Sequence, residues 1–313
     1  MFTEQKLRLS VTRAHLENCL RDRTAAQWVM SARDHARRTV MEPSLRRAYE
    51  RRAKRHNPNL PSLTADVRAM LEAVETEGVH VCPLASLNIP RTDEILQTAR
   101  TLIPKLAQGH ATRHGSYTVQ TDEAFFKAFP ELFLWGLDDN VLDMVENYLG
   151  VPVGYNGIKI NRSIANNVGN STRMWHLDPQ DHRMFRIIVY LSDTDNDDGP
   201  YEYISRQWTE KLRRLLNYSN EHIPDPIMRR AAPADQWKSC VGPRGTAVLT
   251  DTCSVFHRGK VPKDRERYAI FYTYYSATPM HERYLQPGFS PEYLASIDDK
   301  LTERQRASLL WRS

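Results

Sequence analysis

Residues 175–191, WHLDPQDHRMFRIIVYL, decide the fold, because they join a metal-ligand pattern to a buried strand. His176 and Asp178 are two residues apart, so in an extended segment both project to the same side and can reach one ion. The run from Arg186 to Leu191 is β-branched and aromatic, which is typical of a buried strand. His257 follows further along the chain. Two imidazoles and one carboxylate on one face of a metal form the ligand set of non-haem Fe(II) centres, which leaves three coordination positions open.

Arg267, ten residues beyond His257, adds a second element of such a site. A guanidinium holds a carboxylate through two parallel hydrogen bonds and stays charged at any working pH. We therefore expect the co-substrate to be a dicarboxylate, 2-oxoglutarate, with its distal carboxylate on Arg267.

The segments around these residues predict a β-rich core. Residues 157–162, 245–250 and 267–275 have the composition of strands, and His257 lies between the last two. Metal ligands on neighbouring antiparallel strands are what a double-stranded β-helix, the jelly-roll or cupin-type barrel, provides inside its wider mouth. The fold class we expect is α+β: a double-stranded β-helix core with flanking helices and a helical N-terminal extension.

The strand at 267–275 also predicts which side faces the site. Tyr268, Tyr272 and Tyr274 alternate with Arg267 and Phe271. Since successive side chains of a strand point to opposite faces, the Arg267 face should point into the barrel and the tyrosines should pack against outer helices.

Three motifs resemble the phytanoyl-CoA dioxygenase (PhyH-like) family of Fe(II)/2-oxoglutarate-dependent oxygenases, and the resemblance covers roughly residues 62–285. The motifs are Trp175-His-Leu-Asp178, Asp198-Gly-Pro-Tyr-Glu-Tyr-Ile204, and Phe256-His-Arg-Gly259 followed by Arg267. The family often continues Pro-Gly-Ser-His where this chain has Ser205-Arg-Gln-Trp208. We expect that divergent segment to contact substrate rather than metal.

The resemblance implies that Fe(II) binds His176, Asp178 and His257, and that Arg267 holds 2-oxoglutarate. It implies an enzyme, a dioxygenase that consumes 2-oxoglutarate and O2, releases succinate and CO2, and oxidises a C–H bond. We expect a small metabolite or biosynthetic intermediate as substrate. Related halogenases have Ala or Gly at the position of Asp178, so the aspartate indicates hydroxylation or another oxidation.

Two other residue sets carry weaker predictions. Arg183 and Arg186 flank the metal motif, and each is either a contact for an anionic substrate or a charge at the rim. Cys19, Cys82, Cys240 and Cys253 lack the close pairing that zinc sites show, so we interpret them as reduced cysteines.

Residues 1–60 form a basic segment, with fourteen Lys and Arg against six Asp and Glu. Apolar residues recur there at three- and four-residue steps, which predicts helices, and residues 57–62 resemble a linker. We therefore divide the chain into a helical extension (1–60), a catalytic domain (61–289) and a C-terminal helical segment (290–313). The basic charges are interleaved with apolar and acidic residues and no aromatic stacking motif accompanies them, which favours helices that support the barrel or form a homodimer contact over nucleic-acid binding.

The composition is that of a soluble globular protein, with 26% charged residues and no apolar run long enough to span a bilayer. Unpaired cysteines and an Fe(II) requirement fit the reducing cytoplasm. Two alternative functions stay open: an oxygenase that docks nucleic acid or protein through residues 1–60, and a non-catalytic jelly roll that binds metal and senses a ligand.

Overall fold

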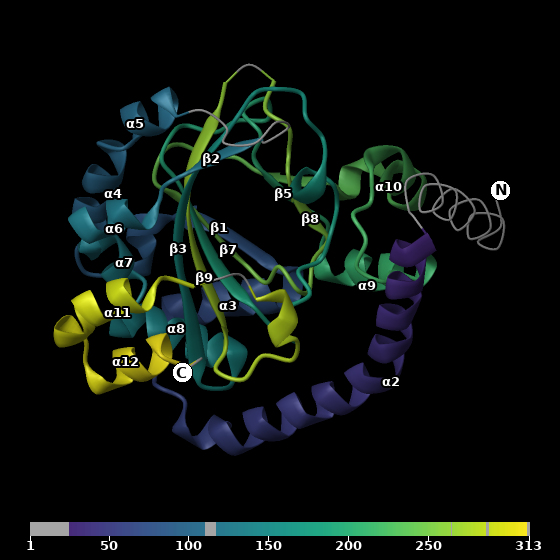
Figure 1. The fold of residues 1–313 in the computed structure, drawn as a ribbon, viewed down its shortest axis with the longest axis horizontal. Helices are drawn as coiled ribbons and strands as arrows, with labels where there is room; N and C mark the ends of the chain where they lie inside the picture. The colour runs from purple at the N-terminus through teal and green to yellow at the C-terminus, as the bar shows by residue number, and fades with distance from the viewer. Residues whose placement is uncertain (1–24, 110–116, 264, 286–287, 312–313) are drawn as a thin grey trace.

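The computed structural model describes residues 25–109, 117–263, 265–285 and 288–311, with side chains from Val40 onward. Its elements are helices and antiparallel strands, and Figure 1 shows the strands together in the middle of the molecule with most helices on one side.

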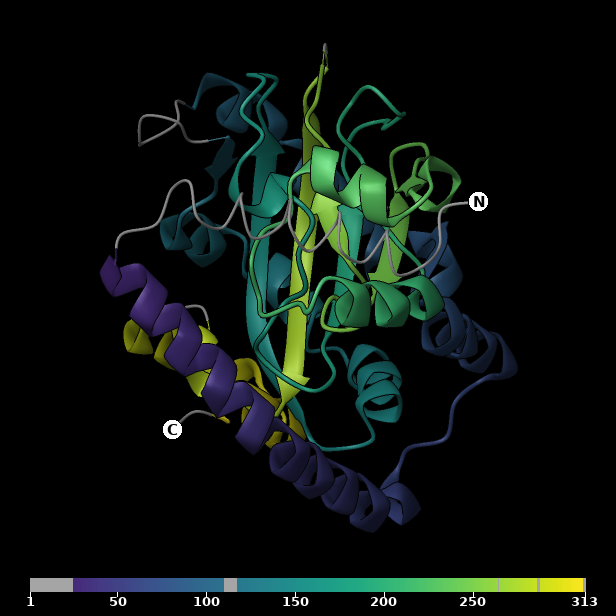
Figure 2. The same ribbon diagram turned by 90° about the vertical axis from the view of Figure 1, so that its right-hand side faces the viewer.

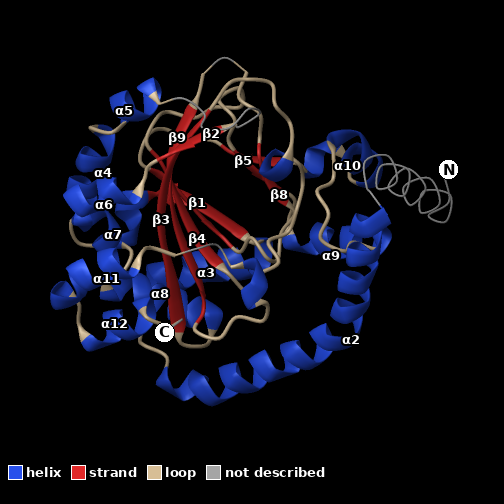
Figure 3. Cartoon of the chain, in the orientation of Figure 1, coloured by secondary structure: helices blue, strands red, loops and turns tan. Residues whose placement is uncertain are grey.

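The strands form two antiparallel sheets (Figure 3). The larger sheet has the order β1-β7-β4-β9-β3-β2, made of Val79–Pro83, Thr246–Thr250, Phe185–Tyr190, Arg267–Ser276, Val153–Ser163 and Thr118–Gln120. The smaller sheet has the order β6-β5-β8, made of Lys238–Cys240, Tyr201–Tyr203 and His257–Gly259. A cluster of buried side chains joins the inner faces of the two sheets, among them Ile188, Val248, Tyr201 and Cys240. The strands expected at 157–162, 186–191, 245–250 and 267–275 are thus confirmed, with small shifts at their ends.

Helices cover the outer face of the larger sheet and form the main hydrophobic core with it. They are α3 Ala65–Glu77, α4 Thr92–Arg100, α5 Ile103–Gln108, α6 Glu123–Ala128, α7 Pro130–Trp135, α8 Asp139–Leu149, α11 Pro291–Ile297 and α12 Glu303–Leu309. Two further helices, α9 Arg206–Leu215 and α10 Asp225–Ala231, lie beside β8.

Strand β9 shows the alternation that the sequence predicts. The hydroxyls of Tyr272 and Tyr274 donate to backbone carbonyls of Leu132 and Gly136 in the helical layer, at 3.1 and 2.9 Å. Arg267 and Phe271 face the opposite side and line a cavity between the sheets. The period of two in this strand therefore separates the core face from the site face.

Helix α2, Ala25–His56, belongs to the basic N-terminal segment, of which residues 1–24, with Cys19, lie outside the described part. Figure 2 shows α2 running along one side of the molecule. Its last turns contact helix α8: Tyr49 donates to the carbonyl of Leu149 at 2.7 Å, and His56 contacts Glu146 at 2.7 Å. Arg52 donates to the carbonyl of Thr278. Part of the basic segment is therefore used for packing.

None of the helices in the described ranges has both the length and the apolar character that crossing a membrane requires.

Candidate metal centre

Backbone pairing brings the three proposed ligands together. His176 and His257 pair as antiparallel residues, with N···O distances of 3.1 and 3.0 Å, which sets their imidazoles side by side. The amide of Asp178 donates to the carbonyl of Thr252 at 2.9 Å, which fixes the carboxylate next to them. One ligand atom from each side chain lies within 4.8 Å of the other two, and no other group of this kind occurs among the described residues.

The backbone also fixes the tautomer of both histidines. His176 Nδ1 lies 2.9 Å from the carbonyl of Met174, and His257 Nδ1 lies 3.0 Å from the carbonyl of Val255. A carbonyl only accepts, so each Nδ1 carries the proton and each Nε2 keeps its lone pair. Those Nε2 atoms lie 3.8 and 3.9 Å from the two carboxylate oxygens of Asp178. The hydrogen bond from Nδ1 to a backbone carbonyl is the usual second contact of a metal-binding histidine.

The protonation states also suit a cation. Burial, with the neighbouring His257, lowers the pKa of His176 to about 3, and burial lowers the pKa of His257 as well. Burial alone would raise the pKa of Asp178, but Arg186, whose Nη2 lies 3.0 Å from Asp178 Oδ2, and the two imidazoles outweigh it and lower the pKa to about 2. At neutral pH the group therefore offers two neutral imidazoles and one carboxylate. Each Nε2 and the carboxylate are free of protons, as metal binding requires.

Arg267 lies at the start of β9 with 7% of its surface exposed. Its Nη1 is buried and has no hydrogen-bond partner, and its guanidinium lies 5.9 Å from the centre of the Tyr190 ring. Burial lowers the pKa of Arg267. A buried guanidinium with an unpaired N–H is costly without an anion.

A cavity of about 300 Å³ connects Arg267 to the three ligands. Apolar and aromatic side chains form part of its wall, including Ile188, Phe271 and Tyr201. This volume lies at the lower end of the range for small-molecule binding sites.

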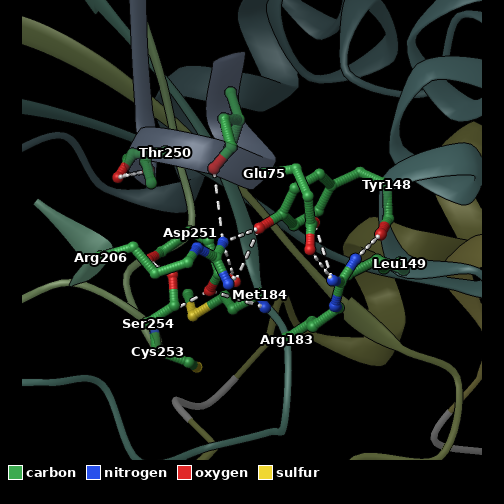
Figure 4. A network of polar contacts seen from close by, with 12 residues as sticks. Glu75, Tyr148, Leu149, Arg183, Met184, Arg206, Thr250, Asp251, Cys253 and Ser254 are labelled. Carbon is green, nitrogen blue, oxygen red and sulfur yellow. Dashed lines mark hydrogen bonds and ion pairs between the residues drawn. The ribbon is translucent and has the colours of Figure 1, made fainter. Parts of the chain in front are cut away.

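A polar network lies next to the metal ligands on the side of α3 and α8 (Figure 4). Asp251 is fully buried and accepts hydrogen bonds from the Tyr148 hydroxyl at 2.8 Å and from the amides of Met184 and Cys253. Arg206 lies 3.5 Å from the same carboxylate. Burial raises the pKa of Asp251, and Arg206 opposes that rise. The network holds Asp251 in place. The next residue, Thr252, has the carbonyl that accepts the hydrogen bond from the Asp178 amide.

Several residues singled out from the sequence lie elsewhere. Arg183 donates to the carbonyl of Tyr148 at 2.7 Å and pairs with Glu75, so the structure does not bring it to this cavity (Figure 4). Residues 205–208 begin α9, and none of them lines the cavity. Cys82, Cys240 and Cys253 are free thiols.

Lys159 and Asp251 are the functional candidates that the sequence reasoning missed. Lys159 lies on β3 at the cavity wall. In the sequence, Lys159 alternates with the apolar residues Ile158 and Ile160, which are buried in the core. This alternation indicates that Lys159 points to the opposite face of the strand. Asp251 has no such signal, because its partners come from distant segments.

No family model matches the chain, and none of the curated proteins matches it. Among solved structures, EctD from S. alaskensis with 2-oxoglutarate and 5-hydroxyectoine is similar at 16% identity and a TM-score of 0.47, covering 72% of this chain and 82% of that one. The epimerase SnoN, in complex with Fe3+, alpha ketoglutarate and nogalamycin RO, has the same identity and TM-score, with 72% and 93% covered. HygX from Streptomyces hygroscopicus, with nickel and 2-oxoglutarate, is 17% identical with a TM-score of 0.43, covering 69% and 88%.

Proposed function

We propose that this protein is a non-haem Fe(II)- and 2-oxoglutarate-dependent oxygenase of the PhyH-like kind, built on a double-stranded β-helix. We propose further that it oxidises a C–H bond of a small metabolite. One observation carries the proposal: two histidines and one carboxylate converge in the same cavity that is lined by Arg267, a buried arginine whose Nη1 has no hydrogen-bond partner. The ligands alone would fit several metals, whereas the arginine adds a requirement for an anion nearby.

The residues fit the metal in number and chemistry. Two imidazole nitrogens and a carboxylate oxygen form the 2-His-1-carboxylate set of Fe(II) oxygenases, which leaves positions for other ligands. The three side chains line the cavity, so a metal that they held would be accessible to a small molecule bound there. Arg267 suits the distal carboxylate of 2-oxoglutarate, because a planar guanidinium binds carboxylates through two parallel hydrogen bonds.

When bound, Fe(II) with 2-oxoglutarate and O2 supplies the oxidising chemistry, which yields succinate and CO2 as the C–H bond is oxidised. The chain supplies geometry and charge. The carbonyls of Met174 and Val255 hold the two imidazoles in the correct tautomer. Arg186 keeps the Asp178 carboxylate ionised and fixes its direction. Arg267 orients the co-substrate.

The test is 2-oxoglutarate turnover by the full chain reconstituted with Fe(II) in air, measured as succinate formed. Because succinate is formed whatever the primary substrate is, candidate substrates can be screened with this one readout. We expect succinate with the wild type and none above background with His257→Ala. The variant Lys263→Met, at a surface lysine paired with Asp197, is the matched control and should behave as wild type. Bound Fe(II) without any succinate, across a broad set of candidate substrates, would contradict the proposal and favour a metal-binding ligand sensor.

A further inference from the structure

The cavity at the metal centre has an unbalanced set of charges. Among the described residues that line it, five are cationic and Asp178 is the sole carboxylate; the cations are Lys159, Arg173, Arg186, Arg258 and Arg267. A cavity lined by an excess of one sign of charge attracts ligands of the opposite sign.

Three of the five cations are already engaged. Arg258 pairs with Glu202 at 2.7 Å and with Asp225, both behind the cavity wall. Arg186 pairs with Asp178. Arg173 is 3% exposed and donates to backbone and side-chain oxygens, including the carbonyl of Ile164 at 2.6 Å, so its guanidinium is used to hold the loop before the metal motif.

Three of the cations have no carboxylate partner among the described residues: Arg173, Arg267 and Lys159. Since Arg173 is already held by the oxygens just described, Arg267 and Lys159 are the two that remain for ligands. Lys159 stands opposite Phe271 in the β3–β9 pairing, whereas Arg267 stands opposite Ser163. Four residues along β9 correspond to about 13 Å, so the two side chains start from well-separated points of the sheet. They suit two different anionic groups better than one.

Lys159 lines the cavity, and its side chain is exposed there. Burial, and to a smaller degree Arg186, lower the pKa of Lys159, which shows that neighbouring atoms limit its hydration and that a second positive charge is close. An ammonium group in this position gains most from a ligand that brings a negative charge.

The charges also do not balance once the proposed cofactors are included. The charge of Fe(II) is cancelled by the two carboxylates of 2-oxoglutarate, and Asp178 is cancelled by Arg186. The positive charges of Arg173, Arg267 and Lys159 then remain in excess. We infer that the primary substrate is itself an anion, and that its carboxylate or phosphate binds the ammonium of Lys159 while its reactive carbon faces the metal; this inference rests on the proposed function.

The experiment uses the full chain loaded anaerobically with Fe(II) and 2-oxoglutarate. Three probes share one ring and differ in charge: benzoate, phenyl phosphate and neutral benzamide. A shift of the visible metal-to-ligand charge-transfer band, as opposed to its loss, reports a probe that binds beside the chelated co-substrate. The comparison of benzoate with phenyl phosphate identifies which anion the site prefers.

We expect at least one of the two anions to bind roughly 10- to 100-fold more tightly than benzamide, the range for a hydrogen bond to a charged group. Lys159→Met should remove that preference, and Lys159→Arg should keep most of it. Lys127→Met, at an exposed lysine on α6 paired with Glu123, should leave it unchanged.

Anions that bind no better than benzamide to wild type, or fail to bind, would overturn the inference while the band itself still supports the proposed function. The same holds if Lys159→Met keeps the full preference. If Lys159→Met instead weakens 2-oxoglutarate, Lys159 serves the co-substrate and the inference is also wrong. The absence of any band in wild type would mean that the proposed function has failed.

Discussion

Replacing Arg267 with Met should separate two effects of a buried cation. In the wild type without 2-oxoglutarate, Nη1 of Arg267 is buried without a partner. Met has a similar length and no charge, so the variant loses this desolvation cost. We therefore expect the unfolding free energy of the ligand-free protein to be unchanged or higher in Arg267→Met, against the usual direction for a buried substitution.

The response to 2-oxoglutarate should change in the opposite sense. Removing one partner of a buried, hydrogen-bonded charge pair costs about 2–5 kcal/mol, which raises the Kd for 2-oxoglutarate by roughly 30-fold or more. At one hundred times the wild-type Kd, the ligand stabilises the wild type by about 2.7 kcal/mol, or roughly 4 °C in Tm for a chain of this length. The same concentration should raise the Tm of Arg267→Met by about 1 °C or less.

The assay is thermal unfolding with Mn(II) in place of Fe(II), so that no turnover occurs, with and without 2-oxoglutarate. The matched control is Arg265→Met, two residues earlier and 63% exposed, whose response should equal that of wild type. A full 2-oxoglutarate shift in Arg267→Met would refute the assignment of Arg267. A strongly destabilised ligand-free variant would refute the claim that its charge lacks compensation.

Three further predictions follow from the geometry of the centre. Arg186→Met leaves the Asp178 carboxylate unpaired, so the metal-free protein should lose about 3 kcal/mol in urea unfolding, and Mn(II) should restore most of it; no restoration would argue against Asp178 as a ligand. The pKa of His176 falls from 6.5 to about 3 on folding, so the unfolded chain binds the proton first, and metal-free stability should decline as pH falls from 6.5 towards 3. His176→Ala should reduce that slope by up to about 1.4 kcal/mol per pH unit, and an unchanged slope would contradict the burial argument. Asp251→Asn places an amide among donors that need an acceptor and leaves Arg206 less compensated, so it should cost roughly 3 kcal/mol in urea unfolding; a cost below the error of the measurement would show that the network is not structural.

Local patterns were sufficient to predict much of the fold. The alternation in β9 assigned Arg267 and Phe271 to the cavity and the tyrosines to the helical layer, because one face of a strand cannot be exchanged for the other without a shift in register. The C-terminal helices were also readable: Ser290 and Thr302 accept hydrogen bonds from the third residue of α11 and α12.

What the sequence could not predict depends on contacts between distant segments. Arg183 and Arg186 both follow the metal motif closely, and the sequence alone does not distinguish their roles. In the structure, Arg183 pairs with Glu75 on α3, whereas Arg186 pairs with Asp178. The partners of Asp251 come from α8, α9 and the loop before β4, so no spacing announces the network. The division of the strands into sheets of six and three is likewise set by long-range pairing.

The most direct test of the central claim is an anaerobic titration of metal-free protein with Fe(II) and then 2-oxoglutarate, followed by visible absorption. We predict a metal-to-ligand charge-transfer band in wild type that is absent in His257→Ala and that needs much more 2-oxoglutarate in Arg267→Met. Fe(II) that binds His176, Asp178 and His257 without producing the band at any 2-oxoglutarate concentration would contradict the claim, because the open positions would then not accept the keto acid.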